Sequence, residues 1–253
     1  MIDVSPGQLV FLLVAGLVAG GVNAVAGGGS LLVFPALLAV GFTPLAANVT
    51  NSVAQWPGYL GLVVGARDDL RGQRRRILLT SAAGIAGSAV GCALLLVLPG
   101  AVFDAVVPAL VLLASVLLAL QPSIKRWIGA PPAGAPDRVA VLVPAVFVAA
   151  VYGGYFGGAL GVILIATLSL CAGDELKRLN ATKGVLSLVI ASVTVVIFAL
   201  RAPVNWAAVA LLAPSTLVGG YLGARLARRL PENVLRAAVV LLGLSVGIYL
   251  LVR

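Results

Sequence analysis

The chain has 253 residues, of which 61% are hydrophobic and 10% charged, with a mean hydropathy of +1.15 and a formal net charge of +9. A soluble domain carries charge on about a quarter of its residues, so this composition excludes a water-facing surface. The basic residues lie in short clusters beside apolar runs, which is typical of membrane topology signals rather than of nucleic-acid binding. We therefore predict an all-α, polytopic membrane protein that is surrounded by the lipid bilayer and has no nucleic-acid partner.

The first apolar stretch, Gln8 to Phe42, is too long for one ordinary spanning helix and is interrupted by Gly27-Gly28-Gly29-Ser30. Glycine and serine are weak helix formers, so we expect two helical pieces there. The chain begins without a cationic segment, and we expect no cleaved signal peptide. Thr43-Pro44 predicts the start of a helix that continues to about residue 66. The other predicted elements of this half are an arginine-rich loop at 67–76 and helices at about 77–97 and 103–120.

The second half repeats this order at an offset of 132 residues, as from Gly21 to Gly153. Leucine and alanine matches would arise by chance in so apolar a chain, but matched glycines, prolines and an Asn-x-Thr motif would not. The clearest pairs are Gly29 with Gly161, Gly87 with Gly219, Gly91 with Gly223, Pro99 with Pro231, and Asn48 and Thr50 with Asn180 and Thr182. We predict two copies of one unit: a first membrane repeat at 1–121, a cytoplasmic linker at 122–138 and a second repeat at 139–253.

The second repeat should hold a broken element at 139–172 and helices at about 180–200, 207–227 and 234–252. The small-residue spacing of Gly87 and Gly91, and of their counterparts, predicts close helix packing. Cys92 and Cys171 occupy apolar contexts at positions that are not equivalent in the repeat. We expect buried thiols there rather than a disulfide or a metal site.

Charges place corresponding loops of the two halves on opposite sides of the membrane. The five-arginine loop at 67–76 has only Arg201 in its counterpart, whereas the uncharged loop at 97–101 corresponds to one with Arg225, Arg228 and Arg229. Cationic short loops face the cytoplasm, so we predict inverted halves with both termini outside a bacterial plasma membrane. The alternative is eight simple spans with parallel halves, which leaves one arginine-rich loop outside.

The broken element at 139–172 lies between the basic linker and the basic turn at 177–178, both of which we expect in the cytoplasm. A segment that starts and ends on one side must enter the membrane and return. By repeat equivalence, the stretch 8–42 does the same from outside. Each half then has one re-entrant hairpin and three spanning helices. The tips, at 27–30 and 157–161, should approach each other near the midplane, where irregular backbone lines a substrate cavity.

The hairpin tips are candidate anion-binding sites. Glycine permits close backbone approach and positive φ, and a helix that begins after a break presents unpaired N–H groups and the positive end of its dipole. The candidate residues are Gly27, Gly28, Gly29 and Ser30 in the first tip and Gly157, Gly158 and Gly161 in the second. The alternative is that these glycines only allow helices to pack.

Polar side chains gather at the start of the helix that follows each break. They are Asn48, Thr50, Asn51, Ser52 and Gln55 in the first half and Asn180, Thr182 and Lys183 in the second. We expect them to bind the anion, although Asn48 and Asn180 also fit a helix-capping role. An ammonium inside a membrane helix is costly unless it is paired, so Lys183 suggests a bound anion as its partner. The alternative is that Lys183 snorkels to the interface.

The acidic residues are too peripheral for a proton or sodium pathway. There is no histidine, and all eight acids fall in or near predicted loops. A membrane potential of about 100 mV, negative inside, favours outward movement of one negative charge by ~2.3 kcal/mol, so an anion exporter needs no coupling ion. We find no P-loop, zinc signature or nucleophile motif, and we expect neither an enzyme nor a cofactor.

At these residues the sequence resembles the sulfite exporter TauE/SafE family, bacterial permeases for sulfite and organosulfur anions. The resemblance is carried by GGVNAVAGGGSLLVFPALLAVGFTPLAANVTNS and by a weaker second copy, GGYFGGALGVILIATLSLCAGDELKRLNATKG, and it covers essentially the full chain. Leu160 and Thr167 stand where Gly28 and Pro35 stand in the first copy, so the tips are not chemically symmetric. The resemblance implies transport of a small sulfur-containing oxyanion across the plasma membrane.

Three functions remain open at this point. The first is facilitated export of sulfite, organosulfonates or related small anions. The second is proton-coupled uptake of a related anion, and the third is a membrane scaffold without transport of its own. The sequence leaves the oligomeric state open, and a homodimer is among the arrangements it allows.

Overall fold

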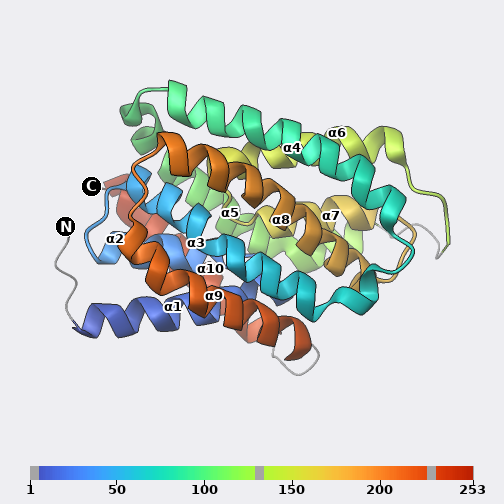
Figure 1. Cartoon of the computed structure of the whole chain (residues 1–253), viewed down its shortest axis with the longest axis horizontal. Coiled ribbons are helices and arrows are strands. Elements are labelled where there is room, and N and C mark those ends of the chain that lie inside the picture. Colours follow the sequence, from blue (N-terminus) through green and yellow to red (C-terminus); the bar gives the residue numbers. More distant parts are fainter. Residues whose placement is uncertain (1–5, 129–133, 227–231, 253) are drawn as a thin grey trace.

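The computed structural model describes residues 6–128, 134–226 and 232–252, and within them the chain is helical without strands, as predicted (Figure 1). The helices are α1 (Pro6–Val25), α2 (Ser30–Ala39), α3 (Pro44–Gly65), α4 (Arg74–Val97), α5 (Gly100–Ile128), α6 (Val139–Tyr155), α7 (Leu160–Cys171), α8 (Leu176–Arg201), α9 (Trp206–Leu226) and α10 (Glu232–Val252), with a 3-10 helix, η1 (Arg67–Leu70), before α4. Arg228 and Arg229, which we predicted in a cationic loop, lie outside the described residues.

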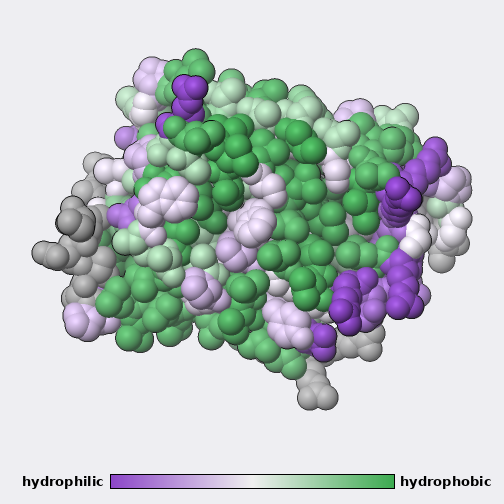
Figure 2. All heavy atoms as spheres, in the orientation of Figure 1, coloured by the Kyte–Doolittle hydropathy of each residue, from purple (hydrophilic) through white to green (hydrophobic). Residues whose placement is uncertain are grey.

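The surface has the character of a multi-pass membrane protein. Among the described residues, five helices are long and apolar enough to cross a bilayer, namely α1, α4, most of α5, α8 and α9. Figure 2 shows apolar side chains over the middle of the molecule and strongly hydrophilic residues gathered at the right-hand end, where Figure 1 places η1 and the start of α4. We call this the arginine-rich end; it includes Arg67, Arg71, Arg74, Arg75 and Arg76.

Both predicted breaks occur, one between α1 and α2 and the other between α6 and α7. The chain folds back at the first break so closely that a Cβ on Gly29 would collide with the carbonyl oxygen of Ala19. Figure 1 shows α2 returning towards the end from which α1 starts. Gly27 and Gly157 have φ values of 83° and 76°, which glycine adopts without strain. Each half of the chain therefore contains one helical hairpin followed by three longer helices.

Several helices extend further than predicted. α5 continues beyond Leu120, through Pro122, to Ile128, so the predicted linker begins as helix. α4 begins at Arg74 and α8 at Leu176, each within a basic segment that the sequence analysis assigned to a loop. Arginine, lysine and leucine are good helix formers, so a polar boundary marks the membrane surface rather than the end of a helix. Cys92 and Cys171 are both buried, as predicted.

Helices α4 and α9 each pack against the opposite half of the chain. Gly87 and Gly91 of α4 face the backbone of α6, and Gly219 and Gly223 of α9 face the backbone of α1. A Cβ at any of these four positions would collide with a carbonyl oxygen or a Cα atom of the facing helix. The small-residue spacing therefore allows close helix packing, as predicted, but the partner helix belongs to the other half.

The two hairpins enter the molecule from opposite ends. In Figure 1, α1 begins at the left end, whereas α6 begins at the right, near the arginine-rich end. Helix α10 finishes on the left, at the end where α1 begins. The inverted relation of the halves across a bilayer and the repeat boundaries at 1–121 and 139–253 stay predictions.

Candidate functional site

The tips of the two hairpins touch through their backbones. A Cβ added to Gly27 would lie 2.7 Å from the carbonyl carbon of Gly161, and one added to Gly161 would lie 2.6 Å from the Cα atom of Gly27. No side chain fits at such distances, so this crossing requires glycine on both sides. The predicted approach of the tips therefore takes place, and these two glycines are used for packing rather than for lining a cavity.

The backbone donors of the first tip are largely used inside the protein. The Gly29 N–H donates to Asn23 Oδ1 at 2.8 Å, and Asn23 Nδ2 donates to Gln55 Oε1 at 2.8 Å. Gln55 Nε2 in turn donates to Asn51 Oδ1 at 3.4 Å. This chain of amides fixes the first tip to α3. Fewer tip N–H groups are thus left for a ligand than the glycine content suggests.

Lys183 is buried next to the first tip, with only 2% of its surface exposed. Its Nζ donates to the main-chain carbonyl oxygen of Asn23 at 3.0 Å. Asn23 lies in the last turn of α1, where carbonyl groups lack helical partners and the helix dipole is negative. The snorkelling alternative for Lys183 is therefore wrong, since its charge is retained inside the protein.

Asn48 and Asn180 bind the ends of the first helix of each hairpin. Asn180 Nδ2 donates to the carbonyl oxygen of Ala24 at 3.0 Å, and Asn48 Nδ2 donates to that of Tyr155, also at 3.0 Å. Each asparagine thus satisfies a carbonyl at the end of a helix from the opposite half. The helix-capping alternative describes both side-chain amides.

The paired threonines make a second set of equivalent contacts. Thr182 donates from Oγ1 to Gln73 Oε1 at 2.6 Å, just before α4. Thr50 Oγ1 accepts from the Asn205 N–H at 3.1 Å, just before α9. Thr182 thus connects α8 to the start of α4, and Thr50 connects α3 to the start of α9. Neither threonine lines the cavity described next.

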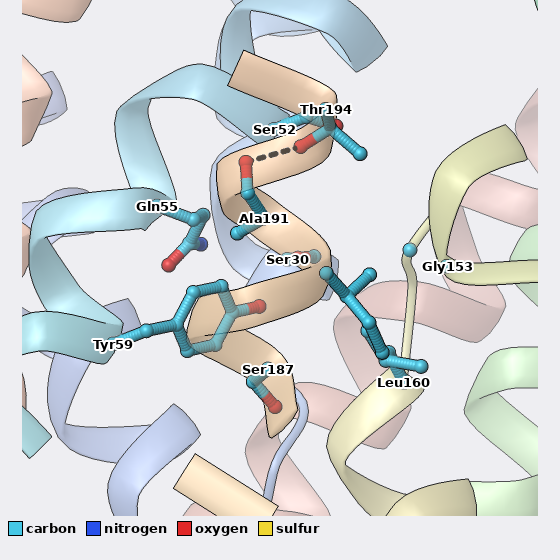
Figure 3. A pocket seen from close by; sticks show the side chains of 11 residues that line it. Ser30, Ser52, Gln55, Tyr59, Gly153, Leu160, Ser187, Ala191 and Thr194 are labelled. Carbon is cyan, nitrogen blue, oxygen red and sulfur yellow. Dashed lines mark hydrogen bonds between the residues drawn. The ribbon is translucent and has the colours of Figure 1, made fainter. Parts of the chain in front are cut away.

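A small cavity with hydroxyl and amide side chains in its wall lies beside the tips, between α3, α8 and the two hairpins (Figure 3). It is lined by Ser30 of α2, by Ser52, Gln55 and Tyr59 of α3, by Gly153, Gly157 and Leu160 of the second hairpin, and by Ser187, Ile190, Ala191 and Thr194 of α8. About 20 Å³ is open to the centres of water-sized molecules, which is room for about one water. In the described conformation this space is smaller than an oxyanion.

The cavity contains a hydroxyl group that the protein leaves unsatisfied. Ser187 is 1% exposed, and its Oγ has no hydrogen-bond partner among the described residues. A buried polar atom of this kind normally binds water or a ligand. The Tyr59 hydroxyl lies nearby, within hydrogen-bonding reach of Ser30 and Asn23, and Figure 3 shows the Tyr59 ring between Gln55 and Ser187.

The predicted residues thus divide into groups with different positions. Ser30, Ser52, Gln55 and Gly157 line the cavity. The other candidates do not line it; they lie in the tips or form hydrogen bonds elsewhere in the fold, and they are Gly27, Gly28, Gly29, Asn48, Thr50, Asn51, Gly158, Gly161, Asn180, Thr182 and Lys183.

Sequence reasoning missed four polar residues of the site: Asn23, Tyr59, Ser187 and Thr194. Asn23 could have been found, because it is an isolated amide within an apolar run just before the triple glycine. Ser187 could also have been found, because it is the repeat counterpart of Gln55. Tyr59 carries no comparable local signal, since an aromatic residue in a membrane helix usually contacts lipid or other helices.

A cluster of ion pairs joins several segments at the arginine-rich end. Arg76 forms ion pairs with Asp137 at 2.8 Å and with Asp174 at 3.0 Å, and Arg178 pairs with Asp174 at 2.7 Å. Burial acts to raise the pKa of Asp174, but hydrogen bonds from Arg76, the Glu175 N–H and Arg178 outweigh it and hold the pKa below its ordinary value. The cluster fastens the start of α4 to the residues that precede α6 and α8.

Comparison with known proteins agrees with this architecture. The sequence profile described as sulfite exporter TauE/SafE matches residues 12–250. A probable membrane transporter protein, YfcA, from Escherichia coli K12 is 30% identical over 244 residues, which cover 90% of this chain and 82% of the relative. The probable membrane transporter protein ORF9 of Sinorhizobium is 24% identical and covers 99% of this chain and 95% of its own length.

A probable membrane transporter protein of Haemophilus influenzae is 25% identical over 246 residues, or 95% of this chain and 93% of the relative. The match to the family profile extends over both hairpins and the helices between them. The family profile matches almost the whole chain, and the fold is that of a multi-pass membrane protein. The chain is therefore a membrane transporter of the TauE/SafE family.

Proposed function

We propose that this transporter is a facilitator that exports small sulfur-containing oxyanions, such as sulfite or organosulfonates, through the cavity between the hairpins. The observation that carries the proposal is the buried ammonium of Lys183, held at the end of α1 beside a polar cavity. The sulfur in the substrate comes from the family description, which names sulfite. The relatives' names support a transporter without specifying its substrate.

The residues of the site can bind an oxyanion through neutral and charged donors. The hydroxyls of Ser30, Tyr59 and Ser187 are all at or beside the cavity wall. Lys183 supplies the positive charge from the adjacent turn of α8, one turn before Ser187. Hydrogen bonds from a charged donor are about twice as strong as neutral ones, so Lys183 should dominate the affinity. The tip glycines and the amide chain position these groups.

Lys183 also sets the sign of the charge that the cavity accepts. A second cation beside a buried ammonium is repelled, whereas an anion stabilises it. The carboxylates among the described side chains lie at the ends of helices, such as Asp69, Asp137 and Asp174, and none lines the cavity. This placement favours movement of an anion down the membrane potential over proton-coupled uptake.

The proposal includes an orientation in the bacterial plasma membrane. The arginine-rich end faces the cytoplasm, and both termini face outward, because short cationic loops are retained inside. The two halves are then inverted repeats whose hairpins enter from opposite faces. Labelling of single cysteines placed at Arg71 and Leu98 in intact cells tests this orientation, since the first should be protected and the second accessible.

Flux into reconstituted vesicles tests the transport activity. We expect sulfite flux that follows an imposed potential and is insensitive to a pH gradient. Accumulation that depends on a proton gradient would instead support the uptake permease. Absence of flux with intact folding would support the scaffold. A binding screen of purified protein against sulfite, sulfate, thiosulfate, sulfoacetate and taurine identifies the preferred anion.

A further inference from the structure

A second polar cavity opens at the arginine-rich end, between the end of α3, the start of α8 and the end of α9. Its volume is about 310 Å³, much larger than that of the central cavity. Its charged and amide lining groups are Asp68, Asp69, Lys177, Asn180 and Arg225. We call it the vestibule. A space of this size accommodates a small oxyanion together with part of its hydration shell.

Polar groups along α8 connect the vestibule with the central site. Asn180 lines the vestibule and donates to the carbonyl oxygen of Ala24 at the end of α1. Lys183 lies one turn further along α8 and donates to the neighbouring carbonyl of Asn23. The Asn23 side chain contacts Gln55, which lines the central cavity. A continuous series of polar groups therefore runs from the vestibule to the cavity.

An ion pair crosses the vestibule. Lys177 Nζ lies 2.6 Å from Asp69 Oδ1, which joins η1 to α8. The Lys177 side chain is 53% exposed, whereas that of Asp69 is only 16% exposed. A carboxylate presents the same acceptor oxygens as a small oxyanion. The Asp69 carboxylate thus pairs with one of the two cations in the wall of the vestibule, the other being Arg225.

We propose that the vestibule is the access site for the transported anion at the arginine-rich end, and that the Asp69 carboxylate holds Lys177 until the anion displaces it. This inference rests on the proposed function. It adds an access route for the anion and identifies the Asp69 carboxylate as a group that competes with the anion for Lys177. Exchange of one acceptor for another at Lys177 removes one of the links between η1 and α8, beside the hydrogen bonds of Arg178 to Arg71 and of Gln73 to Arg178.

The neighbouring acid supplies a matched control. Asp68 also lines the vestibule, but its ion pair is with Arg71 at 3.7 Å, and both side chains are mostly exposed. Asp68→Asn and Asp69→Asn remove the same charge from the same cavity. Only Asp69→Asn frees Lys177. The difference between the two variants therefore separates competition for Lys177 from a general change of the electrostatic field.

Thiol labelling measures access to the vestibule without requiring transport. The substitution Ala66→Cys places a single accessible thiol, the reporter, in the vestibule wall. The native protein measures background labelling, because its two thiols are buried. The reagents are an anionic sulfonate-bearing methanethiosulfonate and its cationic trimethylammonium analogue. Methanesulfonate is the competing anion, because sulfite itself would react with the reagents. Thermal unfolding of each variant identifies any that is misfolded.

We expect the anionic reagent to label the reporter about two- to fivefold faster in Asp69→Asn than in Asp68→Asn. This ratio corresponds to the strength of an ordinary surface ion pair. Lys177→Gln should slow anionic labelling and abolish the effect of Asp69→Asn in the double variant. Methanesulfonate should protect the reporter, and more strongly in Asp69→Asn. Equal effects of the two acid variants, or protection that is independent of Lys177, would overturn the proposal.

Vesicle flux distinguishes this inference from the proposed function. If the native protein moves sulfite but Asp69→Asn behaves like Asp68→Asn in labelling and in flux, the access route is wrong and the function stands. If labelling responds to Asp69 and Lys177 as expected but sulfite and methanesulfonate fluxes are absent, the vestibule binds anions and the export function is wrong.

Discussion

The ammonium of Lys183 donates a 3.0 Å hydrogen bond to the main-chain carbonyl of Asn23, 160 residues earlier in the chain. The contact places the positive charge of α8 against the negative end of α1, so part of the penalty for burying an ammonium is offset by the helix dipole. It also fixes the charge next to the cavity in which we propose that the anion binds.

Replacement of Lys183 by methionine keeps the length of the side chain and removes its charge. We expect the affinity for sulfite to fall by roughly 10- to 100-fold, the value of a hydrogen bond to a charged group. Isothermal titration with purified protein measures the change. Arg201→Met removes one charge from the exposed far end of the same helix and should leave the affinity unchanged. Binding by Lys183→Met within twofold of the native protein would contradict this role.

Gly161→Ala tests the contact between the tips. The added methyl would lie 2.6 Å from the Cα of Gly27, so backbone must move and we expect a loss of about 1–3 kcal/mol in the free energy of unfolding. Gly100→Ala is the control, because a Cβ there meets nothing within 4 Å. Denaturant unfolding in detergent compares the two. Equal stability of both variants would mean that the tips separate readily.

Ser187→Ala should affect binding without affecting stability, because the hydroxyl has no hydrogen-bond partner in the described part of the chain. We expect sulfite affinity to fall by about two- to tenfold. Ser192→Ala should behave in the opposite way, since the Ser192 hydroxyl accepts from Trp56 Nε1 at 2.8 Å, and its loss should lower stability by about 1 kcal/mol. If Ser187→Ala destabilises the protein while binding is retained, the hydroxyl serves the fold.

The ion pairs of Asp174 should make stability depend on pH in the acid range. Its pKa in the folded protein is below the ordinary value of 3.8, so the unfolded state binds the proton more readily. The contribution of Asp174 is complete above that ordinary value and is lost as pH falls through the lower, folded-state pKa. Unfolding temperatures measured between pH 6 and about pH 3 should show a smaller decline in Asp174→Asn than in the native protein. An equal decline in both would contradict the prediction.

The breaks in the helices could be predicted from the sequence because they depend on local chemistry. Consecutive glycines at 27–29 and the glycines near 157 lower the local helix propensity, and both breaks are found within one or two residues of the expected positions. The helix ends were predicted less well, since arginine- and lysine-rich segments at 74–76 and 176–178 continue as helix.

The roles of individual glycines and amides could not be predicted because their partners are far away in the sequence. Gly27 and Gly161 form one contact although 133 intervening residues separate them, and no local pattern distinguishes them from a glycine that lines a cavity. Asn180 likewise fitted two roles, ligand binding and helix capping, and only the structure shows that it donates to the carbonyl oxygen of Ala24. The repeat identifies equivalent positions, but it does not say which surfaces face each other.

The exchange of α4 and α9 between the halves has a consequence for biosynthesis. When the ribosome has inserted only α1 to α5, the glycine face of α4 lacks α6 and the glycine faces of α1 and α3 lack α9. The glycine faces of the first half should therefore contact lipid until the second half has been translated. A truncated product that ends before α6 should accordingly be recognised by membrane quality control rather than persist as a stable half-transporter.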